Sequence, residues 1–149
     1  LTTKCHVPEH DYEIEFGKAS IVREGTDVTV VALARMVPMA LGLCDMLQRE
    51  NISVELIDPR TISPLDTATI LESVARTGRL LIVEETPAAF GLGAEVAARI
   101  ADAGFNDLDA PIKRVNGAFA PTPYAPSLEA AVVPSELDLA QAIRDLALE

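Results

Sequence analysis

Three carboxylates, Asp58, Glu84 and Glu85, stand where predicted strands end, and these are the side chains whose type and position best suit chemistry. Paired carboxylates carry out general acid–base catalysis or bind a cation. No histidine, serine or cysteine nucleophile is placed beside them, and Arg60 and Arg79 offer ion-pair partners. The pattern therefore favours structural or interface acids, and we assign no catalytic residue.

A glycine pair, Gly91 and Gly93, precedes a predicted helix and suggests a phosphate cradle, because a helix N-terminus offers free N–H groups. Val96 stands where the third glycine of a dinucleotide-binding pattern belongs, and Glu95 in the first turn would repel a phosphate. The sequence therefore favours close packing of the helix on the sheet, and we assign no cofactor-binding residue.

The histidines and cysteines lie in contexts that disfavour a metal site. His6 and His10 have the spacing that binds a metal on a helix, but Pro8 between them disfavours that helix. Cys5 lies in a polar stretch and Cys44 within a helical pattern. A disulfide between them stays open as an alternative, although a reduced protein is favoured. We assign no metal ligand.

The composition indicates one globular domain with an aliphatic core. Of 149 residues, 49% are hydrophobic and 4% are aromatic. The formal net charge of −11 disfavours nucleic acid or an anionic membrane as a partner, since both need a local excess of lysine and arginine. No apolar run reaches the roughly 18 residues of a membrane span, and residues 1–11 lack the apolar core of a signal peptide. We therefore expect a soluble, cytoplasmic protein.

Residues 51–66 combine a strand, its end, a turn and a helix start. A short run rich in β-branched residues predicts a buried strand that ends at Asp58. Ser63 is predicted as an N-cap and Pro64 as the first helical residue, with Asp66 in the first turn. In an α/β protein this edge is where ligands and neighbouring chains meet the sheet.

Strand and helix patterns alternate along the chain. The predicted strands are residues 18–23, 27–34, 53–58, 80–83 and one that begins in 111–115, and the predicted helices are 36–50, 64–76, 94–103 and 136–148. Gly78 and Ser135 are predicted caps, and residues 116–126, with three prolines, predict a loop. Such alternation implies a three-layer α/β/α fold with about five strands, mostly parallel. The first strand has no helix after it, so we predict it as an antiparallel edge strand.

Residues 7–146 resemble the C-terminal transketolase-like domain of the β subunit of thiamine diphosphate-dependent 2-oxo acid dehydrogenases. Pyruvate, branched-chain 2-oxo acid and acetoin dehydrogenases share this subunit type. The segments that carry the resemblance are FGKASIVREGTDVTVVALARMV, VELIDPRTISPLD, GRLLIVEETPAAFGLGAEVAARI, DAPIKRV and PTPYAPSLEAAVVP. One departure is the loop after the last strand, which in this family reads near Gly-Pro-Asp-x-Pro and here reads GAFAP at residues 117–121.

The resemblance implies part of a larger enzyme that decarboxylates a 2-oxo acid oxidatively and transfers the acyl group to lipoamide. Residues 1–16 then correspond to a linker after a pyrimidine-binding domain, and residues 17–149 to the domain itself. Thiamine diphosphate and Mg²⁺ belong to the parent enzyme, and we expect this domain alone to bind neither and to be inactive. Its expected partners are the α subunit, a second β subunit and the lipoyl acyltransferase.

Two sets of residues are predicted to serve this support role. The candidates for the subunit or domain interface are Asp58, Arg60, Glu84, Glu85 and Phe90. The candidates for acyltransferase docking are Glu95, Arg99 and Asp102, which share one stripe of a predicted helix, together with Glu149 near the C-terminal end. An ordinary solvated helix face with one weak ion pair is the alternative for the stripe.

Two other functions stay open at this point. The C-terminal domain of a transketolase or of a deoxyxylulose-phosphate synthase would share the fold. A stand-alone module that binds a small anion at the carboxyl edge of the sheet is the third hypothesis.

Overall fold

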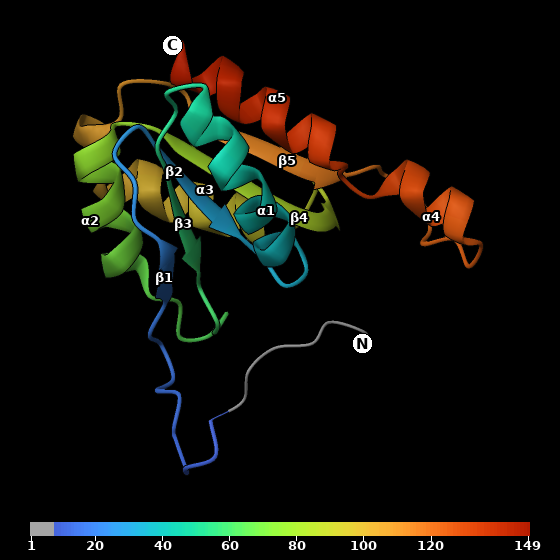
Figure 1. Ribbon diagram of the computed structural model, residues 1–149, viewed down its shortest axis with the longest axis horizontal. Helices are drawn as coiled ribbons and strands as arrows, with labels where there is room; N and C mark the ends of the chain where they lie inside the picture. The colour runs from blue at the N-terminus through green and yellow to red at the C-terminus, as the bar shows by residue number, and fades with distance from the viewer. Residues whose placement is uncertain (1–7) are drawn as a thin grey trace.

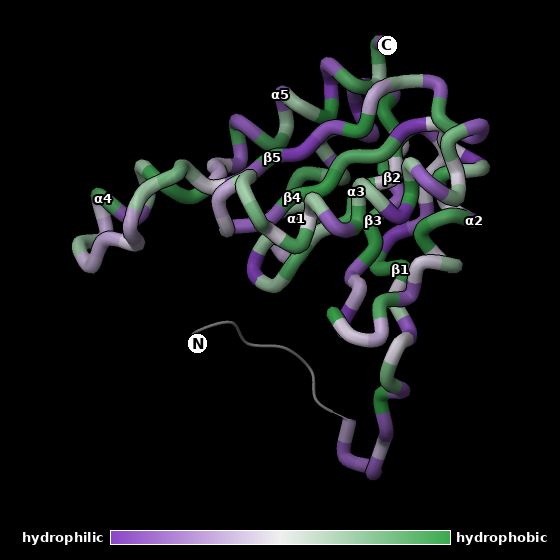
Figure 2. Tube along the Cα trace, turned by 180° about the vertical axis from the view of Figure 1, so that it is seen from behind, coloured by the Kyte–Doolittle hydropathy of each residue, from purple (hydrophilic) through white to green (hydrophobic). Residues whose placement is uncertain are grey.

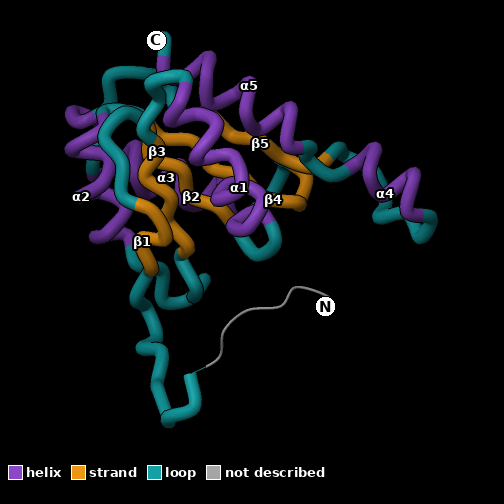
Figure 3. The backbone as a smooth tube through the Cα atoms, viewed as in Figure 1, coloured by secondary structure: helices purple, strands orange, loops and turns teal. Residues whose placement is uncertain are grey.

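The computed structural model describes residues 8–149 and consists of a five-stranded sheet with helices on both faces (Figures 1 and 3). The strand order is β1-β3-β2-β4-β5. In chain order the elements are β1 (Ser20–Arg23), β2 (Val28–Ala32), α1 (Met36–Arg49), β3 (Val54–Asp58), α2 (Thr67–Thr77), β4 (Leu80–Pro87), α3 (Leu92–Ala103), the 3₁₀ helix η1 (Phe105–Asp107), β5 (Lys113–Gly117), α4 (Pro126–Val132) and α5 (Glu136–Ala147).

The sheet is mixed, as the sequence predicted. Strands β2, β3, β4 and β5 are parallel, and β1 pairs antiparallel with β3, with Ser20 opposite Asp58. The prediction of one antiparallel edge strand is therefore confirmed. Because the other four strands are parallel, the loops that follow them meet at one edge of the sheet, which we call the carboxyl edge.

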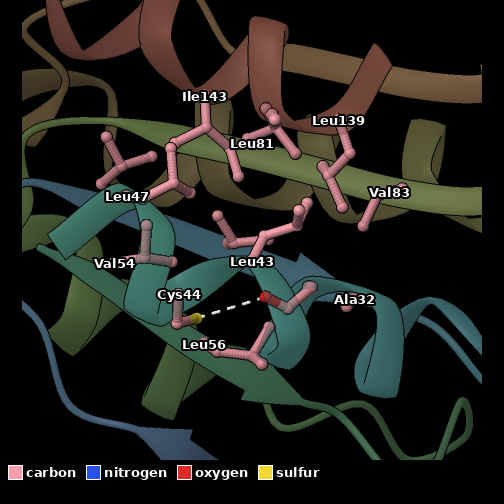
Figure 4. Packing of buried hydrophobic residues seen from close by; sticks show 14 of the residues in the cluster. Ala32, Leu43, Cys44, Leu47, Val54, Leu56, Leu81, Val83, Leu139 and Ile143 are labelled. Atoms are coloured by element: carbon pink, nitrogen blue, oxygen red, sulfur yellow. Dashed lines mark hydrogen bonds between the residues drawn. The ribbon is translucent and has the colours of Figure 1, made fainter. Parts of the chain in front are cut away.

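The core forms two aliphatic layers, one on each face of the sheet. Strand β2 is buried along its whole length and supplies both layers: Val30 and Ala32 pack toward α1 and α5, and Val31 toward α2 and α3. Figure 4 shows the first layer, in which residues of α1 and α5 meet the sheet. Within it the Cys44 thiol donates to the Ala40 carbonyl oxygen at 3.3 Å. Each fully buried aliphatic side chain contributes about 1.5–3 kcal/mol.

The hydropathy-coloured trace shows the same arrangement (Figure 2), with hydrophobic positions concentrated on the central strands. Within residues 8–149, no helix has the length and apolar character needed to cross a membrane. Cys44 is a buried free thiol, and Cys5 and His6 lie outside the described residues, so the disulfide alternative is not tested.

Helix α2 begins later than the sequence predicted. Ser63 and Pro64, joined by a cis peptide bond, lie in the loop, and the N-cap is Asp66, whose carboxylate accepts from the Thr69 backbone N–H at 3.2 Å. The same carboxylate accepts from the Ala19 backbone N–H at 2.9 Å. The expected Ser63 cap is therefore wrong, because Asp66 both caps the helix and holds the chain that enters β1.

Replacing Asp66 by alanine should lower the free energy of unfolding by about 1–2 kcal/mol at neutral pH, because a cap and two further hydrogen bonds are lost. Burial raises the pKa of Asp66, but hydrogen bonds from Ala19 and Thr69 outweigh burial and hold the pKa below its ordinary 3.8. The stabilisation is therefore present above the unfolded-state pKa and is lost as pH falls through the folded-state pKa. Urea unfolding of wild type and Asp66→Ala at about pH 7 and about pH 3 checks this. If wild type and Asp66→Ala differed in the free energy of unfolding by the same amount at both pH values, the prediction would be contradicted. Glu72→Ala, which removes an exposed acid of the same helix, is the control.

Two other predicted caps agree with the structure, whereas α3 begins at Leu92 and not at the predicted Ala94. Gly78 ends α2 in a left-handed conformation with φ of 69°, and Ser135 caps α5 through a reciprocal capping box with Asp138. Helix α4 was not predicted from the sequence. It has no buried residue, and Figure 1 shows it projecting from the side of the sheet.

Candidate functional site

The carboxyl edge gathers exposed apolar and charged side chains from loops that are distant in sequence. It includes the interface candidates Asp58, Arg60 and Phe90, and it adds side chains that follow β3 and β5 or precede β1. We call this set the carboxyl-edge surface: Phe16, Asp58, Arg60, Ile62, Phe90, Phe119 and Tyr124.

Glu84, predicted to lie at a strand end, is instead a buried residue inside β4. Its Oε1 accepts from the Gly93 backbone N–H and from Asn116 Nδ2, each at 2.9 Å. Neither Arg60 nor Arg79 pairs with it within residues 8–149, so the expected ion pairs are wrong. The carboxylate instead joins three adjacent elements: β4, β5 and the start of α3.

This carboxylate explains the glycine pair at the start of α3, where Gly91 is the N-cap and Gly93 lies in the first turn. A Cβ atom on Gly91 would lie 2.4 Å from Glu84 Oε1, and one on Gly93 would lie 2.7 Å away. A side chain at either position would displace Glu84 or the helix. The structure thus supports helix–sheet packing as the role of the glycine pair.

Asn116 is a residue of this edge that sequence reasoning missed. Its Nδ2 also donates to the Thr86 carbonyl oxygen at 3.3 Å, while its Oδ1 is buried and has no partner among residues 8–149. The sequence predicts a loop over residues 116–126, whereas the structure places Asn116 in β5, and a single asparagine carries no signal that would have identified its role. Buried polar atoms are usually paired, so this oxygen is an exception within residues 8–149.

Glu85 is paired with an arginine that the sequence did not indicate. Arg35, which follows β2, lies 2.7 Å from Glu85 and 3.2 Å from Glu129 of α4. The guanidinium therefore connects three segments, and it holds the base of the projecting α4 against β4. All three side chains are partly exposed, so the pairs fix orientation more than they add stability.

A cavity of about 580 Å³ lies between the segment before β1 and the loops after β2 and β3. Apolar side chains line much of it, among them Phe16, Leu33 and Ile62. Asp58 accepts from the Arg60 backbone N–H at 2.9 Å, and Arg60 has a left-handed φ of 56°. The Arg60 side chain makes no ion pair with the described part of the chain. The cavity thus combines apolar walls with the Arg60 guanidinium, which has no ion partner within residues 8–149.

Every aromatic ring of the chain is exposed. The sequence holds four phenylalanines, two tyrosines and no tryptophan, and the least exposed of the six rings, Tyr12, is still 55% exposed. Phe90 is 103% exposed and has a φ of 62°, which is strained for a non-glycine residue. Rings of this size are normally buried in cores or interfaces. Four of the six belong to the carboxyl-edge surface.

The described residues gather no set of chemical groups that indicates a reaction centre. Within residues 8–149, no group of three or more histidine, cysteine, aspartate and glutamate residues is placed to hold a metal ion. Burial raises the pKa of the Cys44 thiol, which makes it a poor nucleophile.

The predicted docking residues lie elsewhere. In α3, Val96 and Ile100 face the core, and Glu95 and Arg99 form a half-exposed ion pair of 2.7 Å. Asp102 is also exposed. Glu149 instead follows α5 on the other face of the sheet, where it lies 3.6 Å from Lys113. The structure therefore keeps the stripe together and separates Glu149 from it by the thickness of the sheet.

The fold and its carboxyl-edge surface define a known class of domain. Residues 17–139 match the model of the family described as transketolase, C-terminal domain, and the chain belongs to this family. It is 47% identical over 138 residues to the pyruvate dehydrogenase E1 component subunit beta of Rickettsia felis, covering 93% of this chain and 42% of that protein. It is 42% identical over 132 residues to the acetoin:2,6-dichlorophenolindophenol oxidoreductase subunit beta of Bacillus subtilis, covering 89% and 39%.

The fold is also that of a solved structure. The chain superposes with a TM-score of 0.79 and 27% identity on one described as a split gene transketolase, inactive beta4 tetramer, covering 93% of this chain and 44% of that one. The resemblance and the fold class predicted from the sequence are thus confirmed. The chain spans about two-fifths of the length of the curated relatives it matches.

Proposed function

We propose that this chain is the C-terminal domain of the β subunit of a thiamine diphosphate-dependent 2-oxo acid dehydrogenase, and that the carboxyl-edge surface is its assembly interface. The exposure of all six aromatic rings carries this proposal, because a domain that acts alone would bury them. The relatives named as pyruvate dehydrogenase and acetoin oxidoreductase β subunits support the enzyme class. Residues 17–149 form the domain and residues 1–16 a linker to the rest of the subunit.

In the parent enzyme, a 2-oxo acid is decarboxylated and its acyl group is passed to lipoamide. Thiamine diphosphate supplies the carbanion chemistry and the protein supplies orientation. The described residues do not fit this cofactor: they offer no cluster of oxygen ligands for Mg²⁺, and Glu95 in the first turn of α3 opposes a diphosphate there. The contribution of this chain is therefore to hold the α subunit, a second β subunit and neighbouring domains.

The substrate of the parent enzyme and the cellular location of this chain are further proposals. Pyruvate dehydrogenase and acetoin oxidoreductase β subunits match with similar identity, so either substrate class suits the parent enzyme. The cytoplasmic location predicted from the sequence stays a prediction, since some plant relatives are named as mitochondrial.

We also propose that the stripe of Glu95, Arg99 and Asp102 on α3 receives the basic subunit-binding domain of the acyltransferase. A protein with a net charge of −11 attracts a basic partner and raises its association rate in a salt-sensitive way. Glu149, on the other face, contributes only if the partner also reaches around the edge of the sheet.

Reversing the two negative charges of the stripe with Glu95→Lys and Asp102→Lys should lower the affinity for the basic domain by about tenfold or more, or roughly 1.4 kcal/mol. Titration calorimetry of this chain with the isolated basic domain at low salt measures the effect. Glu24→Lys and Glu72→Lys, exposed acids outside α3, are the matched control pair with the same change in net charge. If both double variants bind with equal affinity, the stripe is ordinary surface.

A further inference from the structure

A second cavity, of about 530 Å³, lies at the opposite edge of the sheet from the carboxyl-edge surface. It is formed where α1 and α5 end and where β2 and β4 begin. Its charged lining residues are Asp27, Glu50, Arg79 and Arg144. Ile52, Ala147 and Leu148 supply apolar wall, and Asn51 supplies an exposed amide. We call it the amino-edge cavity.

Arg79 is the unusual residue of this cavity. Its Nε is buried and has no hydrogen-bond partner in the described part of the chain, and its guanidinium forms no ion pair there. The backbone beneath it is fixed, because the Arg79 carbonyl oxygen accepts from the Thr29 backbone N–H at 2.9 Å and from Thr77 Oγ1 at 3.1 Å. The guanidinium therefore lines the cavity without a charge partner within residues 8–149, and an anionic acceptor from outside would supply one.

The other charges of the cavity already have partners. Arg144 holds Glu50 through two hydrogen bonds of 2.7 and 2.9 Å, so both side chains are neutralised and fixed. Asp27 accepts from the Ser53 backbone N–H at 2.7 Å, which holds its carboxylate in place. Arg79 is thus the charge of the amino-edge cavity that a ligand would pair with.

We propose that the amino-edge cavity binds a small monocarboxylate with a short aliphatic tail. The planar fork of Arg79 matches a carboxylate with two parallel hydrogen bonds. The tail would lie against Ile52 and Leu148. The Asp27 carboxylate, which forms no ion pair within residues 8–149, repels added negative charge, so a dianion such as phosphate is disfavoured relative to a monoanion. This site is independent of the proposed assembly role, since it lies at the other end of the strands.

The test is a titration of the 149-residue chain with sodium propionate, followed by ¹H–¹⁵N correlation spectra at constant ionic strength. We expect saturable shifts of the amides around Asn51, Arg79 and Ala147, with a weaker response to phosphate. Binding should weaken by about tenfold in Arg79→Gln and by less in Arg79→Lys, which keeps the charge without the fork. Arg60→Gln, which removes an unpaired arginine at the carboxyl edge, should leave propionate binding unchanged.

Four results would overturn the proposal. Shifts that grow linearly with propionate, or that persist in a folded Arg79→Gln variant, would exclude the carboxylate site. Tighter binding of phosphate than of propionate would exclude the monocarboxylate class. If Asp27→Asn bound propionate and the wild type did not, Asp27 would pair with Arg79 in solution and block the site.

Discussion

Replacing Glu84 by alanine should destabilise the domain by about 3 kcal/mol, the largest stability effect that we expect from a single polar side chain. The change leaves two donors, the Gly93 backbone N–H and Asn116 Nδ2, without their shared acceptor. An unsatisfied buried donor costs about 1–3 kcal/mol. The loss also removes the side-chain link that joins β4 to β5 and to the start of α3. Urea unfolding followed by circular dichroism measures the effect.

Two further variants test whether the Glu84 hydrogen bonds cause the loss of stability. Glu84→Gln keeps one acceptor oxygen, so we expect a smaller loss of about 1–2 kcal/mol. Glu85→Ala removes the next carboxylate along the strand, which is partly exposed, and should change the free energy of unfolding by less than about 1 kcal/mol. If Glu84→Ala and Glu85→Ala lose the same stability, Glu84 does not join the three elements as described.

Replacing Phe90 should have the largest effect on assembly. In the β subunit that carries this domain, we expect Phe90→Ala to weaken association with the partner subunit by at least about 30-fold, or roughly 2 kcal/mol. Large aromatic side chains at the centre of an interface carry much of the binding energy. Phe90 is 103% exposed in this chain, so its ring contributes little to the stability of the domain itself. Sedimentation or calorimetry with the purified partner subunit measures the change.

A glycine at this position separates assembly from stability. Phe90 has a left-handed φ of 62°, a conformation that glycine adopts without strain. Phe90→Gly should therefore stabilise the isolated domain by about 1 kcal/mol while it weakens assembly. Phe105→Ala removes a ring that is 72% exposed but lies in η1, outside the carboxyl-edge surface, and is the matched control. If the Phe90→Ala and Phe105→Ala variants bound the partner subunit with equal affinity, Phe90 would not be an interface residue.

Much of the architecture could be predicted because its signals are local. The continuous apolar run of β2 predicts a strand covered on both faces, and the structure buries each of its residues. Gly78 and Ser135 end and begin helices through geometry that involves only near neighbours. The low aromatic content predicted an aliphatic core, and all six rings are in fact exposed.

Local patterns along the chain thus predicted the five strands, the helices that cover the sheet, their alternation and the antiparallel edge strand, but not the projecting helix α4. The roles of Asp66 and Glu84, in contrast, depend on tertiary contacts. Asp66 caps α2 in place of Ser63 because it also binds Ala19, which is 47 residues away. Glu84 is buried because Gly93 and Asn116 meet it from α3 and β5. Such roles depend on groups that only folding brings together, and a pattern of neighbouring residues contains no information about them.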